Sequence, residues 1–267
     1  MIRQEEKRLE RITSTGNKLI REVRDLERKA RARRDSGLFV AEGERLCREI
    51  PADYIERIFV AEDYAGALPS FREVSDGKRA TKMFQVPREL MEHMADTKNS
   101  QGILAVVRQK TYTELPGDFF LILDTLQDPG NMGTIFRTAE AAGVDGILMN
   151  TGCVDVYSPK VVRATMGAMF RMPFLVSENL PKEMLRMKER GVKLYAAHLK
   201  GTENHWGFDY REPTAFMIGN EGNGLQEDIA SLADHYLRIP MMGQTESLNA
   251  GVAASVLMYE ALRQRMS

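Results

Sequence analysis

Residues 119–149 read FFLILDTLQDPGNMGTIFRTAEAAGVDGILM, and the prediction of the fold starts from them. The apolar runs predict one buried strand over 119–124 and another over 146–149. Between them, a polar loop containing Pro129 and Gly130 precedes a helical pattern from about 132 to 142. Short strands that are apolar throughout and alternate with helices are typical of a parallel sheet covered on both faces.

The same alternation continues to the carboxyl end. Strands are predicted at 174–176, 193–197, 215–219 and 236–239, and helices at 159–169, 181–190 and 248–265. In sheets of this kind ligands bind outside the carboxyl ends of the strands. We therefore expect a mostly parallel α/β sheet whose functional residues lie on the loops that follow its strands.

The first part of the chain has a smaller version of this pattern. Strands are predicted at 38–41, 57–61, 82–86 and 102–107, and helices at 17–34, 45–50 and 87–94. A polar segment with the pair Pro116-Gly117 follows, which is typical of a linker. The prediction is thus a small α/β domain over 1–110, a linker over 111–118 and a larger α/β domain over 119–267.

Composition excludes several classes of protein. The chain has 267 residues, of which 43% are hydrophobic, and this is enough for a packed core rather than a disordered chain. No apolar run approaches the roughly 20 residues of a membrane-spanning helix. The first residues, MIRQEEKRLER, are charged and lack the apolar stretch of a secretory signal. Cys47 and Cys153 are too few for a disulfide framework, so we expect a cytoplasmic protein.

Charge is unevenly distributed although the net charge is −1. Residues 1–34 contain 12 Lys or Arg against 6 Asp or Glu, a local balance of +6. A basic front end on a slightly acidic body suggests an anionic partner. The alternative is a solvated helix, because Glu22, Asp25 and Glu27 are interspersed among the arginines.

Three loops carry the polar residues of chemical interest, and the first is 123–143. Arg137 follows Asn131 by less than two helical turns. An arginine close to the start of a helix can hold a phosphate with help from free backbone N–H groups. The alternative is an ordinary strand-to-helix connection, with Asn131 as the N-cap and Arg137 in a surface ion pair.

The second loop follows the apolar run of AFMIGNEGNGL, residues 215–225. Its glycines allow a close approach to a ligand and positive φ angles. No Gly-Lys-Ser or Gly-Lys-Thr follows, which argues against phosphate binding of the Walker type. Glu221 would repel phosphates and suits a ligand with an amine or a positive sulfur. The alternative is a plain tight turn.

The third loop lies within RIPMMGQTESLNAGVAASVLMYEAL, residues 238–262. The prediction is that Ser247 caps a helix rich in small residues, which can pack closely on a neighbour or a ligand. Asn249 is the polar exception in the first turn of that helix. Alternatively, Ser247 is only a cap and Asn249 a surface residue.

Together, three segments resemble the signature motifs of the SpoU/TrmH family of RNA ribose 2′-O-methyltransferases, within the SPOUT superfamily. They are DPGNMGTIFRTAEAAG, IGNEGNGL and IPMMGQTESLNAGVAAS. The segment SPKVVRATMGAMFRMPF, residues 158–174, is similar to the family's stretch between the first two motifs. LFVAEGERL, residues 38–46, resembles the substrate-binding domain of longer members, which is related to small ribosomal RNA-binding proteins.

The resemblance implies a carboxyl-terminal part tied into a trefoil knot, a rare exception to unknotted topology. It also implies S-adenosylmethionine as cofactor, a homodimer with each site completed across the interface, and no metal. Residues implied to line the cofactor pocket are Gly219, Gly222, Ile239, Met241 and Leu248.

The family assigns the position of Arg137 a central catalytic role, sometimes as the base. A guanidinium is almost never neutral, so we expect Arg137 instead to hold a phosphate and to lower the pKa of the 2′-hydroxyl electrostatically. Solvent then accepts the proton. Asn131 and Asn249 are expected to orient the ribose and Arg137, and Glu221 and Ser247 to shape the pocket.

The first domain is then interpreted as an RNA-binding domain. Candidates for phosphate contacts are Arg28, Lys29, Arg31, Arg33 and Arg34. Ribosomal RNA is favoured over tRNA because of the added domain. The alternatives are a tRNA ribose methyltransferase, an RNA base methyltransferase and an inactive RNA-binding protein.

Overall fold

A computed structural model describes residues 9–69, 81–97, 99–198 and 200–267. The prediction about a leader segment concerns in part the first eight residues, which lie outside these ranges. The chain divides into two compact units, one of residues 1–110 with 157–163 and one of 111–156 with 164–267. The predicted domain limits differ from this division at 157–163, and they stay a prediction.

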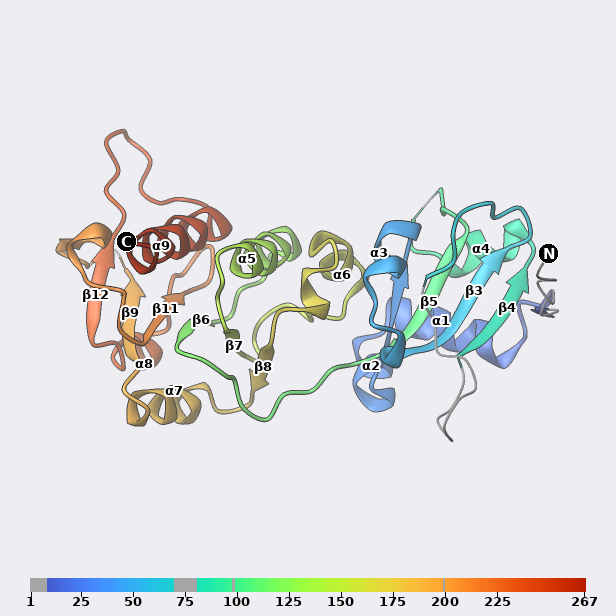
Figure 1. Ribbon diagram of the computed structural model, residues 1–267, viewed down its shortest axis with the longest axis horizontal. Helices are drawn as coiled ribbons and strands as arrows, with labels where there is room; N and C mark the ends of the chain where they lie inside the picture. Colours follow the sequence, from blue (N-terminus) through green and yellow to red (C-terminus); the bar gives the residue numbers. More distant parts are fainter. Residues whose placement is uncertain (1–8, 70–80, 98, 199) are drawn as a thin grey trace. The chain divides into compact units, whose positions relative to one another are not determined.

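The second unit contains a sheet of seven strands, all parallel, in the order β10-β12-β9-β11-β6-β7-β8 (Figure 1). The strands are β6 (Phe119–Leu123), β7 (Gly146–Asn150), β8 (Phe174–Ser177), β9 (Lys193–Ala197), β10 (Glu203–Asn204), β11 (Thr214–Ile218) and β12 (His235–Arg238). The expectation of a mostly parallel α/β sheet is confirmed. The trefoil knot implied by the resemblance stays a prediction.

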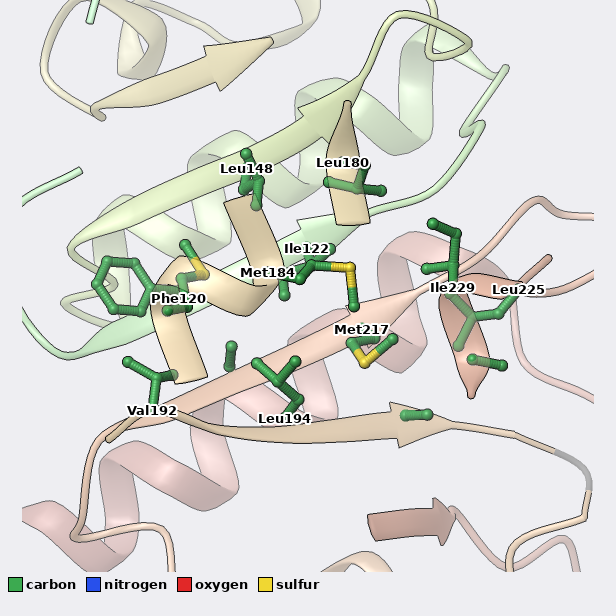
Figure 2. Packing of buried hydrophobic residues seen from close by; sticks show 14 of the residues in the cluster. Phe120, Ile122, Leu148, Leu180, Met184, Val192, Leu194, Met217, Leu225 and Ile229 are labelled. Atoms are coloured by element: carbon green, nitrogen blue, oxygen red, sulfur yellow. The ribbon is translucent and has the colours of Figure 1, made fainter. Parts of the chain in front are cut away.

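Helices cover both faces of this sheet, as Figure 1 shows. On one side lie α5 (Pro129–Ala141) and α9 (Ala250–Arg265), which pack against each other, and on the other lie α7 (Leu180–Glu189) and α8 (Glu227–Ala230). In Figure 2, Leu180 and Met184 of α7 lie over the apolar side chains of the central strands. Continuous burial on both faces explains why these strands have no polar alternation.

Two helix starts differ from the sequence-based prediction. Helix α5 begins at Pro129, and Asp128 caps it by accepting a hydrogen bond from Asn131 N at 2.7 Å. Helix α9 begins at Ala250. Asn249 Oδ1 caps it by accepting hydrogen bonds from Gly251 N at 3.0 Å and Val252 N at 3.2 Å. Asn131 and Ser247 are therefore not N-caps. Proline suits the first helical position because its missing N–H would have no partner there.

The helix predicted at 159–169 is also shorter than expected. Helix α6 (Pro159–Ala164) ends before Met166 and Gly167, whose φ angles are +51° and +93°. A 3₁₀ turn, η2 (Ala168–Phe170), follows. Left-handed backbone at two successive residues cannot continue an α-helix, and the apolar periodicity of the segment does not reveal it.

The first unit has a five-stranded mixed sheet in the order β1-β4-β3-β5-β2. Its strands are β1 (Glu10–Arg11), β2 (Leu38–Glu42), β3 (Ile55–Ala61), β4 (Lys82–Val86) and β5 (Ile103–Arg108), and its helices are α1 (Lys18–Arg28), α2 (Ala30–Ser36), α3 (Glu44–Glu49) and α4 (Arg88–Met94), with η1 (Ala52–Tyr54). Apolar residues of α1 and α4 pack on one face of this sheet. The predicted small α/β domain is thus present.

The long helix predicted over 17–34 is broken at Lys29, whose extended backbone (φ −121°) separates α1 from α2. The break folds Arg33 back onto the end of α1. Its guanidinium is buried and donates to the carbonyl oxygens of Leu26 at 2.6 Å and Glu27 at 3.3 Å. Arg33 therefore satisfies free helix carbonyls, and its expected role as a phosphate contact is corrected here.

Glu27 of α1 is a buried carboxylate of the first unit. Burial, and after it the nearby charges of Asp96 and Glu42, raise its pKa to about 8, and the opposing influence of Arg163 and Arg33 is smaller. Above the ordinary pKa of a glutamate, the unfolded chain has released the proton of Glu27, whereas the folded protein still binds it up to a pH of about 8. The resulting stability is complete below the ordinary pKa and is lost as the pH rises through about 8.

The variant Glu27→Gln is accordingly expected to resist alkaline conditions better than the natural chain. An amide stays neutral, so thermal unfolding of the two proteins should coincide near pH 5 and diverge toward pH 9, by about 1 kcal/mol or more, or roughly 2–4 °C. Calorimetric scans over this range measure the difference. Two parallel pH profiles would show that Glu27 does not carry the proton.

Candidate active site

The polar loops of the second unit meet at the carboxyl ends of β6, β7 and β11. The loop after β6 is tied to the loop after β11 by Asn220, whose Nδ2 donates to Thr125 O at 2.9 Å. Because neighbouring parallel strands end at the same edge of a sheet, residues distant in sequence come together there.

Asn131 is the centre of this arrangement. Its side chain is buried, and its Nδ2 donates to Glu221 Oε1 at 3.0 Å. Its Oδ1 accepts from Asn249 Nδ2 at 2.8 Å. One amide therefore joins the three motifs, and three of the five predicted site residues are directly connected.

Glu221 uses both carboxylate oxygens to hold the loop before α5. Besides Asn131, it accepts from the backbone N–H of Asp128 at 3.0 Å and of Gln127 at 3.2 Å. Partial burial opposes the charged form, but the hydrogen bonds from Asn131 and Asp128 outweigh it and hold the pKa of Glu221 below its usual range. Glu221 therefore holds Asn131 and the loop before α5, and the expectation that this exposed carboxylate also faces a ligand cation stays a prediction.

Arg137 lies on α5 beyond Asn131, and its side chain is exposed. Within the described ranges, no carboxylate or carbonyl pairs with its guanidinium, so the surface ion pair considered above is not found. An exposed guanidinium beside a fixed amide network can hold an external anion in a bidentate manner.

Ser247 is exposed and makes no hydrogen bond with the network of Asn131. The apolar candidates Ile239, Met241 and Leu248 are half-buried. They belong to the segment 239–249 between β12 and α9, so they offer partly accessible apolar surface next to the capped start of α9.

The glycines of the second motif have distinct structural roles. A Cβ on Gly219 would lie 2.1 Å from Gly224 C and 2.2 Å from Leu225 N. These distances are too short for non-bonded atoms, so only glycine fits unless the backbone moves. Gly224 has a φ of +71°, whereas Gly222 has no such angle and room for a Cβ. The loop folds back on itself through Asn220 and Gly224, which exchange two backbone hydrogen bonds of 2.9 Å. At Gly219 the two sides of this loop are therefore in contact through backbone atoms and not through side chains.

Sequence reasoning missed three polar residues behind the site, namely Asp124, Asn150 and Gln226. Asp124 is completely buried at the end of β6 and binds the other two through its carboxylate. The available signal was a carboxylate at the end of a strand that is otherwise entirely apolar. Among the described residues, no helix is both long and apolar enough to cross a membrane.

Comparison with known proteins gives matches over both units. Residues 118–259 match the model of the SpoU rRNA methylase family, and residues 17–105 match the MRM3-like substrate-binding domain. A tRNA/rRNA methyltransferase of Synechocystis, described as uncharacterized, is 33% identical over 95% of this chain and 94% of its own length. The 23S rRNA (guanosine(2553)-2′-O)-methyltransferase RlmP of Bacillus subtilis is 30% identical over 94% of this chain and 98% of its own.

Among solved structures, an rRNA methyltransferase of Sinorhizobium meliloti with bound AdoMet superposes with a TM-score of 0.81. It is 27% identical and covers 97% of this chain and 99% of its own. The motifs joined at Asn131 lie within the matched family region, and the family model covers more than half of the chain. The chain therefore belongs to the SpoU rRNA methylase family.

Proposed function

We propose that the protein transfers a methyl group from S-adenosylmethionine to the ribose 2′-hydroxyl of a specific nucleotide in structured RNA, and that the RNA is ribosomal. The observation that carries this proposal is the hydrogen-bonded chain Glu221–Asn131–Asn249, next to the exposed guanidinium of Arg137. It supplies fixed amides and an exposed cation, which suit a sugar next to a phosphate.

The glycine loop, residues 219–225 after β11, and the segment 239–249 fit S-adenosylmethionine as cofactor. Gly219 keeps the backbone accessible at a place where any side chain would collide. Ile239, Met241 and Leu248 provide half-buried apolar surface suited to an adenine ring, and Gly222 is exposed in the same loop as Gly219. When bound, this cofactor supplies an electrophilic methyl group on a positively charged sulfur.

Arg137 has two tasks in the proposed mechanism. Its guanidinium binds the phosphate next to the target ribose, and its charge lowers the pKa of the 2′-hydroxyl. The proton leaves to solvent, because a guanidinium cannot accept it. Asn131 and Asn249 orient the ribose so that its oxygen is in line with the methyl group, and this alignment supplies much of the acceleration.

Ribosomal RNA is favoured by the first unit, since residues 17–105 match a substrate-binding domain, and by the relative RlmP, which is a 23S rRNA 2′-O-methyltransferase. A tRNA substrate, base methylation and loss of catalysis are the competing functions. Modification mapping of rRNA and tRNA from cells lacking the gene, with complemented cells as control, separates them. A missing ribose methylation in rRNA is the expected result; a missing base methylation, or one confined to tRNA, contradicts the proposal. The proposed substrate implies a cytoplasmic location.

The proposed homodimer is supported by an apolar stripe on α9. Val252 and Tyr259 of α9 and Met266, the C-cap that follows the helix, are 46, 51 and 79% exposed and follow one another at intervals of seven residues. This spacing places them along one face of the helix. The proposed partner is a second copy of the chain, because an isologous contact would bury the stripe against the same stripe of the other copy. Since α5 packs beside α9, this contact would also bring Arg137 of α5 near the partner.

Replacing Tyr259 with glutamate should convert the dimer into a monomer, because two buried like charges would face each other across the twofold axis. Sedimentation velocity measures the change. Leu185→Glu on α7 is the matched control, since Leu185 is 49% exposed but lies on the opposite face of the sheet. A dimer that persists in Tyr259→Glu, or a monomer in the natural protein, would exclude this interface.

RNA binding by the first unit is proposed to rest mainly on Arg28 and Arg34. Both are exposed and have no ion pair within the described ranges, whereas Lys29 pairs with Asp25 at 2.7 Å and Arg31 with Asp35 at 3.3 Å. Paired charges release fewer counterions on binding, so these two residues should contribute less.

The double variant Arg28→Gln/Arg34→Gln should bind RNA less tightly and with a flatter salt dependence. Two lost phosphate contacts should reduce the slope of log K against log salt by roughly 1.5. Filter binding at several salt concentrations measures this slope. Arg186→Gln/Arg211→Gln removes the same charge from the second unit, at residues already paired with Glu183 and Asp209. An unchanged slope in the first variant would leave these arginines as a solubilising surface.

A further inference from the structure

Asp124 has an environment that the proposed mechanism does not use. Its side chain is completely buried, directly after β6. Oδ1 accepts hydrogen bonds from Thr125 Oγ1 at 2.8 Å, Asn150 Nδ2 at 2.7 Å and Gln226 Nε2 at 2.6 Å. Oδ2 accepts from Gln226 N at 2.7 Å. All four donors are neutral, so the buried charge is balanced by dipoles alone within the described part of the chain.

These donors come from two loops and the end of one strand. Thr125 belongs to the loop before α5, Asn150 ends β7, and Gln226 follows the glycine loop. Thr125 N also donates to Asn150 Oδ1 at 3.0 Å, and Thr125 has a φ of +57°, which is costly for a β-branched residue. The hydrogen bonds around Asp124 therefore hold the backbone in a conformation that it would not adopt alone.

We propose that Asp124 is a positioning residue that fixes the glycine loop relative to the loop carrying Asn131. The proposal rests on the function proposed above for these loops. Asp124 touches neither substrate nor cofactor. It acts through Gln226 on one loop and through Thr125 on the other, and thus sets the separation at which Glu221 reaches Asn131. Weakening the hydrogen bonds of Asp124 should therefore lower the affinity of the cofactor site at temperatures where the sheet is still folded.

The variant Gln226→Glu tests this proposal. It places a carboxyl group where an amide now donates to Asp124 at 2.6 Å. In its protonated form the introduced carboxyl group can still donate. In its ionised form it repels Asp124, whose side chain is completely buried although residue 226 is itself exposed. The Kd of S-adenosylhomocysteine, measured by calorimetry, should stay within about threefold of the natural value near pH 5.5 and rise at least about tenfold near pH 8.

Other titratable groups near Asp124 do not explain such a profile. Burial raises the pKa of Cys153 to about 11, so its thiol stays neutral over this range. Glu227, which follows Gln226, is exposed and unchanged in every variant. The natural protein measured at the same pH values removes any contribution from these groups.

Gln264→Glu is the matched control. Gln264 Nε2 also donates to a carboxylate, Glu260 Oε1, at 2.8 Å, but near the end of α9. Both variants should lose thermal stability as the pH rises, whereas only Gln226→Glu should lose affinity for S-adenosylhomocysteine. The double variant Asp124→Asn/Gln226→Glu removes the repulsion between two carboxylates and should recover part of the affinity at pH 8, while the amide nitrogen introduced at position 124 leaves one of the remaining N–H donors without an acceptor. A purely structural role predicts no such recovery.

Equal affinities of Gln226→Glu and the natural protein for S-adenosylhomocysteine across the pH range would overturn the proposal. If Gln226→Glu does not fold, Gln226→Met, which removes the donor without adding charge, replaces it and should weaken binding at all pH values. These measurements need no RNA. A natural protein that binds S-adenosylhomocysteine but methylates no RNA therefore contradicts the proposed function and leaves the role of Asp124 intact.

Discussion

Replacement of Arg137 by lysine is expected to slow methyl transfer by about 100-fold or more. A lysine keeps the charge but loses the planar fork that binds two phosphate oxygens at once. Arg137 has no pairing partner in the described part of the chain, so its replacement breaks no internal contact. The loss should therefore fall on the rate and leave the Kd of S-adenosylhomocysteine within about threefold.

Single-turnover transfer to the target RNA measures the rate, and calorimetry measures the affinity. Arg186→Lys is the control, because Arg186 is an exposed arginine of α7 that already pairs with Glu183 at 2.8 Å. Turnover close to normal in Arg137→Lys would exclude both the bidentate phosphate contact and a role of the guanidine as base.

The second large effect is expected for Gly219→Ala, which should weaken binding of S-adenosylhomocysteine about 100-fold. The added Cβ would lie 2.1 Å from Gly224 C, so the backbone of the glycine loop must move. Overpacking of this kind costs about 1–3 kcal/mol, and the upper end corresponds to roughly a 100-fold change in affinity. The loop also carries Glu221, so its displacement should loosen Asn131 as well.

Calorimetric titration of Gly219→Ala beside Gly222→Ala gives a direct comparison. A Cβ on Gly222 would approach only Asn220 Oδ1, at an ordinary 3.6 Å, and Gly222 has no positive φ. Both substitutions remove one glycine from the same loop and differ in the space available. Similar affinities in the two variants would show that the close approach at Gly219 does not shape the cofactor site.

The two-residue strand β10 is polar and was not predicted, whereas the central strands β6, β7 and β11 could be predicted well because each is a short apolar run between polar loops. Burial on both faces imposes this pattern locally, so no distant residue has to be known. Helix starts were harder to predict. Asp128 and Asn249 are the caps, although Asn131 and Ser247 have equally suitable side chains. The choice depends on where the backbone turns from extended to helical, which neighbouring elements decide.

The basic segment of the first unit shows the same limit. Arg33 and Arg34 are adjacent and identical in sequence terms, yet Arg33 is buried against the carbonyls of α1 and Arg34 is exposed. The break at Lys29 produces this difference. A helical pattern predicts which face is apolar, but not where a helix stops when the next segment continues with good helix formers.

Sequence alone determined the class of fold, the order of the elements and the three motifs that identify the family, because hydrophobic pattern and motif spacing are local properties of the chain. Tertiary structure decided that Asn131 joins Glu221 to Asn249, residues 90 and 118 positions away from it, and that Glu221 holds the loop before α5. It also decided that Asp124 is buried beneath that network. Such contacts arise where parallel strands end side by side, and only the order of strands in the sheet specifies which loops meet there.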